Sequence, residues 1–300
     1  MTHALVLGGG GLVGIAWEIG ILTGLAEAGC DLSGPGHGSS LQPDSIVGTS
    51  AGSVVGALLG TVGLGDMATM ALDDARAAVA MENLPLLDFA LMEECFAAWR
   101  ILPDDSPDSL ATIGRMALKF EGVGETRYVQ SIADAVGHEW LDSRFRCTSV
   151  NAYDGTFAVW SASSGVSLAR AVAASCAVPT VFPAVSIEGG AEAVRHIDGG
   201  VRSGTSIDLV AGTERILVLA PIGSWAGDAL DSSAAAAVVR ETAIAEAAGS
   251  SVITLYPDEA TNTATMYSLL TRMDPGARLP ALEHGVRQGL ALSKQLHGWW

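Results

Sequence analysis

One serine of this chain stands where a nucleophile would be expected. Ser50 is the centre of Gly48-Thr49-Ser50-Ala51-Gly52, which fits the pattern Gly-x-Ser-x-Gly. A strand-like run precedes it and a helical run follows it, so the serine occupies a tight strand-to-helix turn. Such a turn is strained, and glycines on both sides let the strand and the helix approach each other. We predict a nucleophilic Ser50; the alternative is a serine that only caps the helix.

A second glycine cluster also lies between a strand pattern and a helix pattern. Gly8-Gly9-Gly10-Gly11-Leu12-Val13-Gly14 lets consecutive backbone N–H groups turn toward one point, which an oxyanion hole requires. The cluster also fits G-x-G-x-x-G, the dinucleotide fingerprint, which expects an acidic residue at the end of the next strand. Glu27 has about the right spacing but falls within the first predicted helix. We therefore rank dinucleotide binding second.

The third candidate is an aspartate at the end of a short strand pattern. In His196-Ile197-Asp198-Gly199-Gly200 the two glycines would let the carboxylate face a cleft without crowding. Asp-Gly pairs are also common in ordinary turns. The motif therefore gains weight only together with the two glycine motifs.

These groups require a fold that brings the ends of separate strands together. Two β–turn–α units are predicted, with strands at 3–7 and 44–48 and helices at 14–28 and 51–59. Further strands are predicted at 146–153, 156–161, 194–197, 215–220 and 251–256, with a helix at 231–248. The pattern predicts an α/β fold with a mainly parallel, doubly wound sheet.

Composition excludes several classes of protein. Of 300 residues, 49% are hydrophobic and 16% charged, which excludes a disordered chain. The net charge of −17 disfavours nucleic-acid partners and gives no long-range attraction to an anionic bilayer. The apolar stretch 4–25 lacks a preceding basic residue and is interrupted by Glu18 and by glycines, so neither a signal peptide nor a membrane span is expected.

The four cysteines are scattered along the chain and contain no CxxC pair. Cys30, Cys95, Cys147 and Cys176 are expected to be buried thiols of a protein in a reducing compartment. Their spacing suits neither disulfide staples nor a zinc site. A cytoplasmic location follows as an expectation.

Taken together, the motifs resemble those of bacterial patatin-like phospholipases. The matching residues occur in the family's order within residues 8–200 and are Gly8-Gly9-Gly10-Gly11 with Gly14, Gly48-Thr49-Ser50-Ala51-Gly52, Ala174-Ser175-x-Ala177-x-Pro179 with Phe182-Pro183, and Asp198-Gly199-Gly200. The resemblance implies a three-layer α/β/α sandwich that hydrolyses lipid acyl esters without a metal or other cofactor. It also implies a Ser50–Asp198 dyad, with the amides around Gly9, Gly10 and Gly11 as the oxyanion hole.

One position departs from the family pattern. Val13 stands where the family usually has Arg or Lys just before the last glycine of its motif. The departure weakens the expectation that the chain holds an anionic head group. It leaves the backbone donors of the glycine loop unaffected.

A dyad requires an unusual aspartate, and a histidine is the alternative base. A free carboxylate has a pKa of about 3.9, and enclosure in an apolar cleft would raise that pKa. His196 shares a strand face with Asp198 but is expected to be structural, as are His138 and His284 in predicted helices. Ser175-Cys176 lacks flanking glycines and is interpreted as a packing turn.

We expect one domain, 1–300, with a helical insertion around 66–140 that is interrupted at 103–108. The part between 84 and 120 either borders an acyl pocket or forms ordinary core helices; its apolar residues are Leu86, Leu87, Phe89, Leu91, Met92, Phe96, Trp99 and Met116. Trp299-Trp300 would anchor at a membrane interface, pack on the domain or pack on a second copy of the chain.

The predicted function is a serine acyl hydrolase of the phospholipase A, lysophospholipase or esterase type. Its partner is an acyl-lipid substrate, with peripheral membrane contact left open. Two alternatives use the same fold: an acyltransferase, and a non-catalytic module that binds nucleotide or lipid. The oligomeric state is not predicted.

Overall fold

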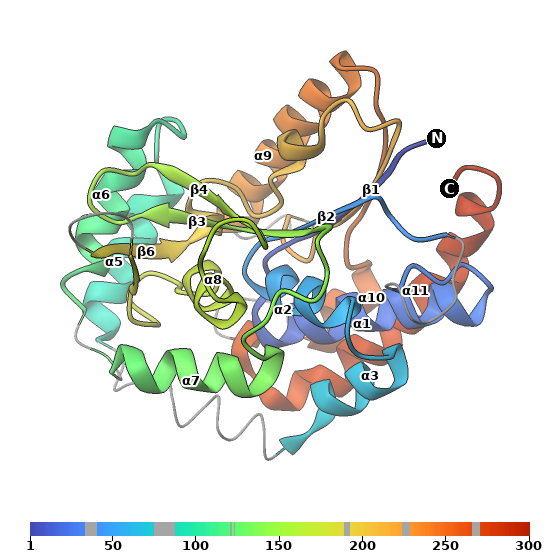
Figure 1. The fold of residues 1–300 in the computed structure, drawn as a ribbon, viewed down its shortest axis with the longest axis horizontal. Coiled ribbons are helices and arrows are strands. Elements are labelled where there is room, and N and C mark those ends of the chain that lie inside the picture. The colour runs from blue at the N-terminus through green and yellow to red at the C-terminus, as the bar shows by residue number, and fades with distance from the viewer. Residues whose placement is uncertain are drawn as a thin grey trace.

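The chain folds around one mixed β-sheet with helices on both faces (Figure 1). The computed structural model describes residues 1–33, 41–74, 88–120, 122, 124–188, 193–223, 229–265 and 271–300. The strands are β1 (His3–Leu7), β2 (Ser45–Gly48), β3 (Phe145–Asn151), β4 (Phe157–Trp160), β5 (Val185–Glu188), β6 (Ala193–Asp198), β7 (Arg215–Leu219) and β8 (Ser251–Leu255). The helices are α1 (Gly11–Glu27), α2 (Ala51–Leu59), α3 (Leu64–Leu72), α5 (Phe89–Arg100), α6 (Pro107–Ala117), α7 (Glu125–Val136), α8 (Leu168–Ser175), α9 (Ala229–Ala247), α10 (Glu259–Thr265) and α11 (Arg278–Leu296).

The sheet has a parallel half and an antiparallel half. The order of its strands is β5-β6-β3-β2-β1-β7-β8. In addition, β4 pairs with β3. The strands β8, β7, β1, β2 and β3 are parallel to one another, whereas β4 and β6 run antiparallel to β3. The predicted α/β fold with a mainly parallel central sheet is confirmed.

Alternating residues of the central strands bury both faces of the sheet. Leu5 and Leu7 of β1 belong to the core beneath α1 and α2. Ala4 and Val6, between them in the sequence, belong to a second core with Val238 of α9. Because successive side chains of a strand point to opposite faces, one apolar run supplies both cores. The result is the three-layer α/β/α sandwich, with α9 on the face opposite α1 and α2 (Figure 1).

The end-to-end arrangement of two strands determines where the candidate site forms. Cys147 of β3 pairs with Gly48 of β2 and with Trp160 of β4, so β2 and β4 occupy opposite edges of β3. β6 pairs with β3 farther along the edge that β2 occupies, and it runs the opposite way. β2 ends at Gly48 beside Cys147, and β6 ends at Asp198 beside Ser149. The carboxyl ends of β2 and β6 therefore point toward each other.

Five described helices lie between β2 and β3, and the last four of them, α3, α5, α6 and α7, form the helical insertion that the sequence periodicity indicates. α5 ends at Arg100 and α6 begins at Pro107, on either side of the break at 103–108. Ile113 of α6 packs with Val150 of β3 and thereby extends the layer that contains α9. This part of the insertion is thus built onto the antiparallel half of the sheet.

Two local expectations differ from the structure. His138 was expected in a helix, but α7 ends at Val136, because Gly137 adopts a positive φ of 77° that terminates it. His284 lies within α11, as expected. The strand β5 was not anticipated, because four residues are too short for a clear periodic pattern.

The C-terminal tryptophans pack on the domain. The indole N–H of Trp300 donates to the carbonyl of Leu41 at 2.7 Å, and its ring stacks on His3 at 4.9 Å. The indole N–H of Trp299 donates to Ser251 Oγ at 3.0 Å. The contacts observed for this pair are therefore contacts with the domain. Among the helices of the described ranges, none combines the length and apolarity needed to cross a membrane.

α1 and α11 touch each other through their backbones. A Cβ atom at Gly24 would lie 2.1 Å from the carbonyl oxygen of Val286, and one at Gly289 would lie 2.3 Å from that of Ile21. Trp17 Nε1 donates to Gln288 Oε1 at 2.8 Å beside this contact. α11 therefore holds α1, the helix that begins at the glycine-rich loop, without an intervening layer of side chains.

The close contact leads to a stability prediction. Gly24→Ala should lower the free energy of unfolding by about 2–4 kcal/mol, because the added methyl group must push two backbones apart. Chemical denaturation monitored by circular dichroism measures the change. Gly65→Ala in α3 is the matched control, since a Cβ there meets nothing within 4 Å, and it should stabilise by about 0.5–1 kcal/mol. Equal effects of the two substitutions would contradict the contact.

Candidate active site

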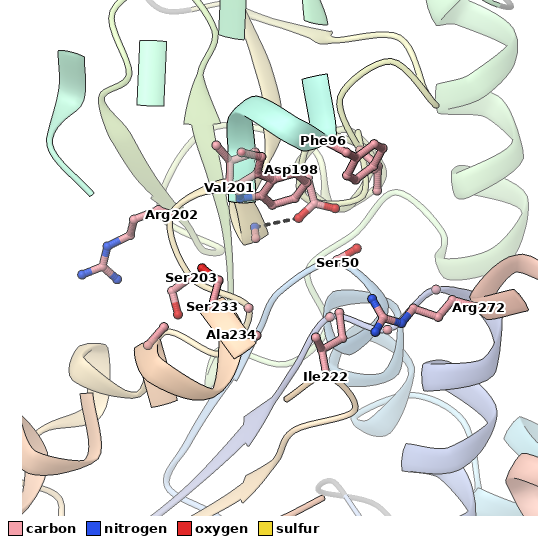
Figure 2. A pocket seen from close by; sticks show the side chains of 18 of the residues that line it. Ser50, Phe96, Asp198, Val201, Arg202, Ser203, Ile222, Ser233, Ala234 and Arg272 are labelled. Carbon is pink, nitrogen blue, oxygen red and sulfur yellow. Dashed lines mark hydrogen bonds between the residues drawn. The ribbon is translucent and has the colours of Figure 1, made fainter. Parts of the chain in front are cut away.

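A cavity of about 820 Å³ opens where β1, β2 and β6 end. Ser50, Asp198 and the loop Gly9-Gly10-Gly11 all line it. The side chains of Ser50 and Asp198 lie next to each other on its wall (Figure 2). The structure thus brings together three motifs that are far apart in the sequence.

Ser50 sits in a strained turn between β2 and α2. Its φ of 52° and ψ of −118° are values that residues with a side chain rarely adopt. A Cβ at Gly52 would lie 2.1 Å from the carbonyl oxygen of Leu7, and one at Gly48 would lie 2.4 Å from that of Gly52. The flanking glycines are therefore required by the close approach of β1, β2 and α2.

The last residue of α8 and the two residues after it hold the backbones of both candidate residues. The N–H of Ser50 donates to Ser175 Oγ at 3.0 Å, and the N–H of Asp198 donates to the carbonyl of Ala177 at 2.9 Å. Cys176 Sγ donates to the carbonyl of Ser50 at 3.2 Å. Ser175-Cys176, interpreted from the sequence as a packing turn, thus packs against the backbone of Ser50. Three consecutive residues fix the relative position of Ser50 and Asp198.

Asp198 is buried, with 2% of its surface exposed. Its Oδ1 accepts the N–H of Gly200 at 2.7 Å (Figure 2). Oδ2 makes no hydrogen bond of standard geometry within the described residues, which leaves it open to the neighbouring Ser50 hydroxyl. At Gly199 a Cβ would lie 2.2 Å from Thr148 Oγ1, so a glycine is needed where the chain turns away from β6.

The surroundings of Asp198 make it a stronger base than an ordinary aspartate. Burial raises the pKa of Asp198 to about 7, and hydrogen bonding by the Ser50 hydroxyl and the Gly200 amide offsets only part of that effect. A carboxyl group of this pKa can accept and return a proton near neutral pH.

The glycine loop provides fewer free amides than the sequence suggested. The N–H of Gly9 donates to the carbonyl of Gly204 at 2.9 Å, so this predicted donor is already engaged. No described residue accepts the N–H of Gly10 or Gly11, both of which line the cavity at the start of α1. The carbonyl of Gly10 accepts the N–H of Gly14 at 2.9 Å, which starts α1 three residues earlier than predicted. Gly10 and Gly11 therefore remain as the candidate donors.

His196 is structural in its surroundings. Its Nδ1 lies 2.9 Å from Ser149 Oγ, and its ring meets that of Trp160 edge-on at 5.1 Å. Burial lowers the pKa of His196 to about 4, so the ring is neutral near pH 7. No histidine is present among the described residues that line the cavity.

The dinucleotide alternative lacks its acidic residue at the required place. Glu27 is exposed at the last position of α1 and does not lie at the end of a strand. The strand that follows, β2, leads directly into the Ser50 turn.

Apolar side chains from three parts of the chain form most of the cavity wall. The insertion contributes Met92, Phe96, Trp99 and Leu102, and the segment after α8 contributes Val178, Val181 and Phe182. α9 and the loop before it contribute small or aliphatic residues, namely Ile222, Ala234, Ala236 and Ala237. Of the other insertion residues considered, Phe89, Leu91 and Met116 do not line the cavity, and Leu86 and Leu87 lie outside the described residues.

Val13, the position where the family usually has a basic residue, does not line the cavity. Three arginines among the described residues do. Val13 is fully buried in the core beneath α1. Arg202 is held by Asp208 through hydrogen bonds of 2.9 and 2.5 Å, and Arg240 lies 3.5 Å from Asp105 at the rim. Arg272 is 3% exposed, and its guanidinium extends toward Ser50 (Figure 2). No motif of the sequence marked Arg272.

Comparison with known proteins identifies similar sequences and folds. The sequence model of the family described as patatin-like phospholipase matches residues 5–211. Among solved structures, VipD from Legionella pneumophila is similar, with a TM-score of 0.44 and 14% sequence identity over 98% of this chain and 67% of that chain. No curated protein sequence matches the chain.

The strain at Ser50 can be measured as stability. Ser50→Gly should be more stable than Ser50→Ala by about 1–2 kcal/mol, because glycine adopts a positive φ without a clash. Thermal unfolding of the two variants measures the difference. The same pair of substitutions at Ser53, inside α2, should give the opposite order, since alanine favours a helix interior. If alanine were favoured at both positions, Ser50 would not be strained.

Proposed function

Because the chain belongs to the patatin-like phospholipase family, we propose that it hydrolyses lipid acyl esters through a Ser50–Asp198 dyad. The observation that carries the proposal is the meeting of Ser50 and a buried Asp198 at the wall of one largely apolar cavity. Membership in the family supports ester hydrolysis as the class of reaction. The geometry of the described residues supports the assignment of roles.

In the first half of the reaction, Ser50 Oγ attacks the carbonyl carbon of the ester. Asp198 accepts the hydroxyl proton, and the carbonyl oxygen becomes an oxyanion that the amides of Gly10 and Gly11 stabilise. The N-terminus of α1 adds a partial positive charge at the same place. Protonated Asp198 then gives its proton to the departing alcohol, which leaves an acyl group on Ser50.

In the second half, water replaces the alcohol. Asp198 accepts a proton from the water as it attacks the acyl carbon, and the second oxyanion uses the same amides. Collapse of this intermediate releases the fatty acid, and Asp198 returns the proton to Ser50. A carboxyl group whose pKa is about 7 suits both directions of transfer.

The apolar wall of the cavity favours a substrate whose acid part is a fatty acyl chain. We assign one domain to residues 1–300, and its insertion around 66–140 borders the acyl pocket through Met92, Phe96 and Trp99. These side chains line the same cavity as Ser50. Burial of each methylene of the chain would contribute about 0.8 kcal/mol to binding.

Three substitutions test the dyad. Ser50→Ala should reduce kcat for p-nitrophenyl butyrate by about 10³-fold or more, and Asp198→Asn by about 10²- to 10⁴-fold, because each removes a reacting group. His196→Ala should retain activity within a few fold, since His196 contacts Ser149 and not Ser50. Circular dichroism confirms that each variant is folded. Full activity in Asp198→Asn, together with loss in His196→Ala, would overturn the assignment.

The pH profile tests the role of Asp198 as the base. Only the ionised carboxylate accepts the Ser50 proton, so kcat/KM should rise about tenfold per pH unit below pH 7 and level off above it. His196→Ala should keep the same inflection, because the pKa of His196 lies at about 4. A profile whose rise occurs near pH 4 would mean that burial does not raise the pKa of Asp198.

A further inference from the structure

Glu241 of α9 is a buried carboxyl group that the proposed reaction does not use. Its side chain is 1% exposed and does not line the cavity. Its Oε2 accepts the N–H of Ile207 at 2.8 Å and the hydroxyl of Thr205 at 3.2 Å. Both donors belong to the segment 199–207, which begins directly after Asp198. A carboxyl group of α9 thus holds the segment that starts at the candidate base.

The segment 199–207 is folded tightly and needs contacts to hold it. Ser203 Oγ accepts the N–H of Ser206 at 2.8 Å and that of Thr205 at 3.2 Å. Ser206 has a φ of 57° and a ψ of 45°, a left-handed conformation that a residue with a side chain adopts at a cost. Because this turn is strained, its shape depends on its hydrogen bonds, and Glu241 accepts two of them from outside the segment.

The same turn holds the glycine loop. The carbonyl of Gly204 accepts the N–H of Gly9 at 2.9 Å, and both Ser203 and Gly204 line the cavity. The carbonyl of Gly8 in turn accepts the N–H of Gly52, two residues after Ser50, at 2.9 Å. Hydrogen bonds therefore lead from Glu241 through the turn to the loop whose next amides are the candidate oxyanion donors.

The position of Glu241 is one where an apolar side chain would be expected. Its neighbours on α9, Val238 and Ala245, belong to the apolar core between this helix and the sheet. A carboxyl group in such a place is costly to remove from water. Burial raises the pKa of Glu241, and the Ser203 hydroxyl and the Ile207 amide oppose that effect. The contacts with the segment 199–207 are thus what the buried carboxyl group provides to the fold.

We propose that Glu241 is a positioning residue of the active site, which keeps the amides of Gly10 and Gly11 directed at the oxyanion. This inference rests on the proposed ester hydrolysis. Glu241 acts through Gly204 and Gly9 and touches neither the substrate nor the reacting atoms. It lies beyond residue 211, where the family match ends.

Substitutions of Glu241 test the proposal through the split between kcat and KM. Glu241→Leu should lower kcat for p-nitrophenyl butyrate by roughly 10- to 100-fold and change KM less than about threefold, because an oxyanion hole acts on the transition state. Glu241→Gln keeps an acceptor oxygen for the Ile207 amide and should recover most of the loss. Glu246→Leu, the same change at an exposed position of α9, is the matched control and should leave kcat unchanged.

An inhibitor separates positioning from a merely structural role. A butyl trifluoromethyl ketone forms a tetrahedral adduct with the serine and carries an oxyanion, so its affinity should fall in Glu241→Leu by the same factor as kcat/KM. Inhibition by butyrate, which forms no such adduct, should stay the same. Met67→Ala, a core substitution in α3, controls for lost stability: it should lower the melting temperature without changing kcat of the folded protein.

Thr205→Val provides a second variant in case Glu241→Leu does not fold. It removes the hydroxyl that donates to Glu241 and should lower kcat about three- to tenfold at an unchanged KM. If both variants fold, combining them should cost no more than Glu241→Leu alone, because both substitutions act through one turn.

The outcomes separate this inference from the proposed function. If wild type does not hydrolyse p-nitrophenyl butyrate, the proposed function fails, and the role of Glu241 fails with it. If wild type is active and folded Glu241→Leu keeps its kcat, only the role of Glu241 fails; an unchanged kcat in Thr205→Val decides the same way if Glu241→Leu is unfolded. A raised KM with kcat unchanged would also overturn the inference, since it would assign Glu241 to the binding of substrate.

Discussion

The structure of the site depends on Ser175, the last residue of α8, and on the two residues after it, which hold the backbones of Ser50 and Asp198. Ser175 accepts the amide N–H of Ser50, and Ala177 accepts that of Asp198. β2 and β6 approach from opposite directions along one edge of β3, and the two strands do not pair with each other within the described residues. Without these contacts, β2 and β6 would end along the same edge of β3, but nothing would fix Ser50 relative to Asp198. The contacts with Ser175 and Ala177 therefore hold the Ser50 hydroxyl and the Asp198 carboxyl group at a fixed distance.

The site concentrates several unfavourable features that the surrounding core must offset. Ser50 has a strained backbone, Asp198 is a carboxyl group removed from water, and Arg272 is a buried cation. Each lowers stability by itself. The first two also have a chemical use in the proposed reaction: Ser50 presents its hydroxyl to the cavity, and Asp198 is a base that works near neutral pH. The tightly packed α1, α2 and sheet beneath them supply the compensating burial.

Sequence reasoning could predict the parts of the site that are determined locally. Ser50 and its glycines form one strand-to-helix turn, and Asp198 ends a strand, so residue types and spacing were enough to select them and the α/β fold. The engagement of the Gly9 amide with Gly204, the contact of Ser175 with Ser50 and the position of Arg272 were not predictable in this way. Each depends on segments that meet only in the folded chain, more than 100 residues apart for Gly9 and Ser175. The family motif contained Ser175, but a serine without flanking glycines gives no local sign of what it contacts.

The backbone contact between α1 and α11 affects how accurately the glycine loop is placed. Where two helices meet through long side chains, rotamer changes allow the helices to shift slightly relative to each other. Between α1 and α11, carbonyl oxygens face glycine Cα atoms, so there are no side chains whose rotamers could change. The amides of Gly10 and Gly11, at the start of α1, are therefore held in place by the rigid pair of α1 and α11. α11, which lies beyond the end of the family match at residue 211, therefore supports the glycine loop of the candidate active site, and an insertion into α11 would displace the candidate donor amides.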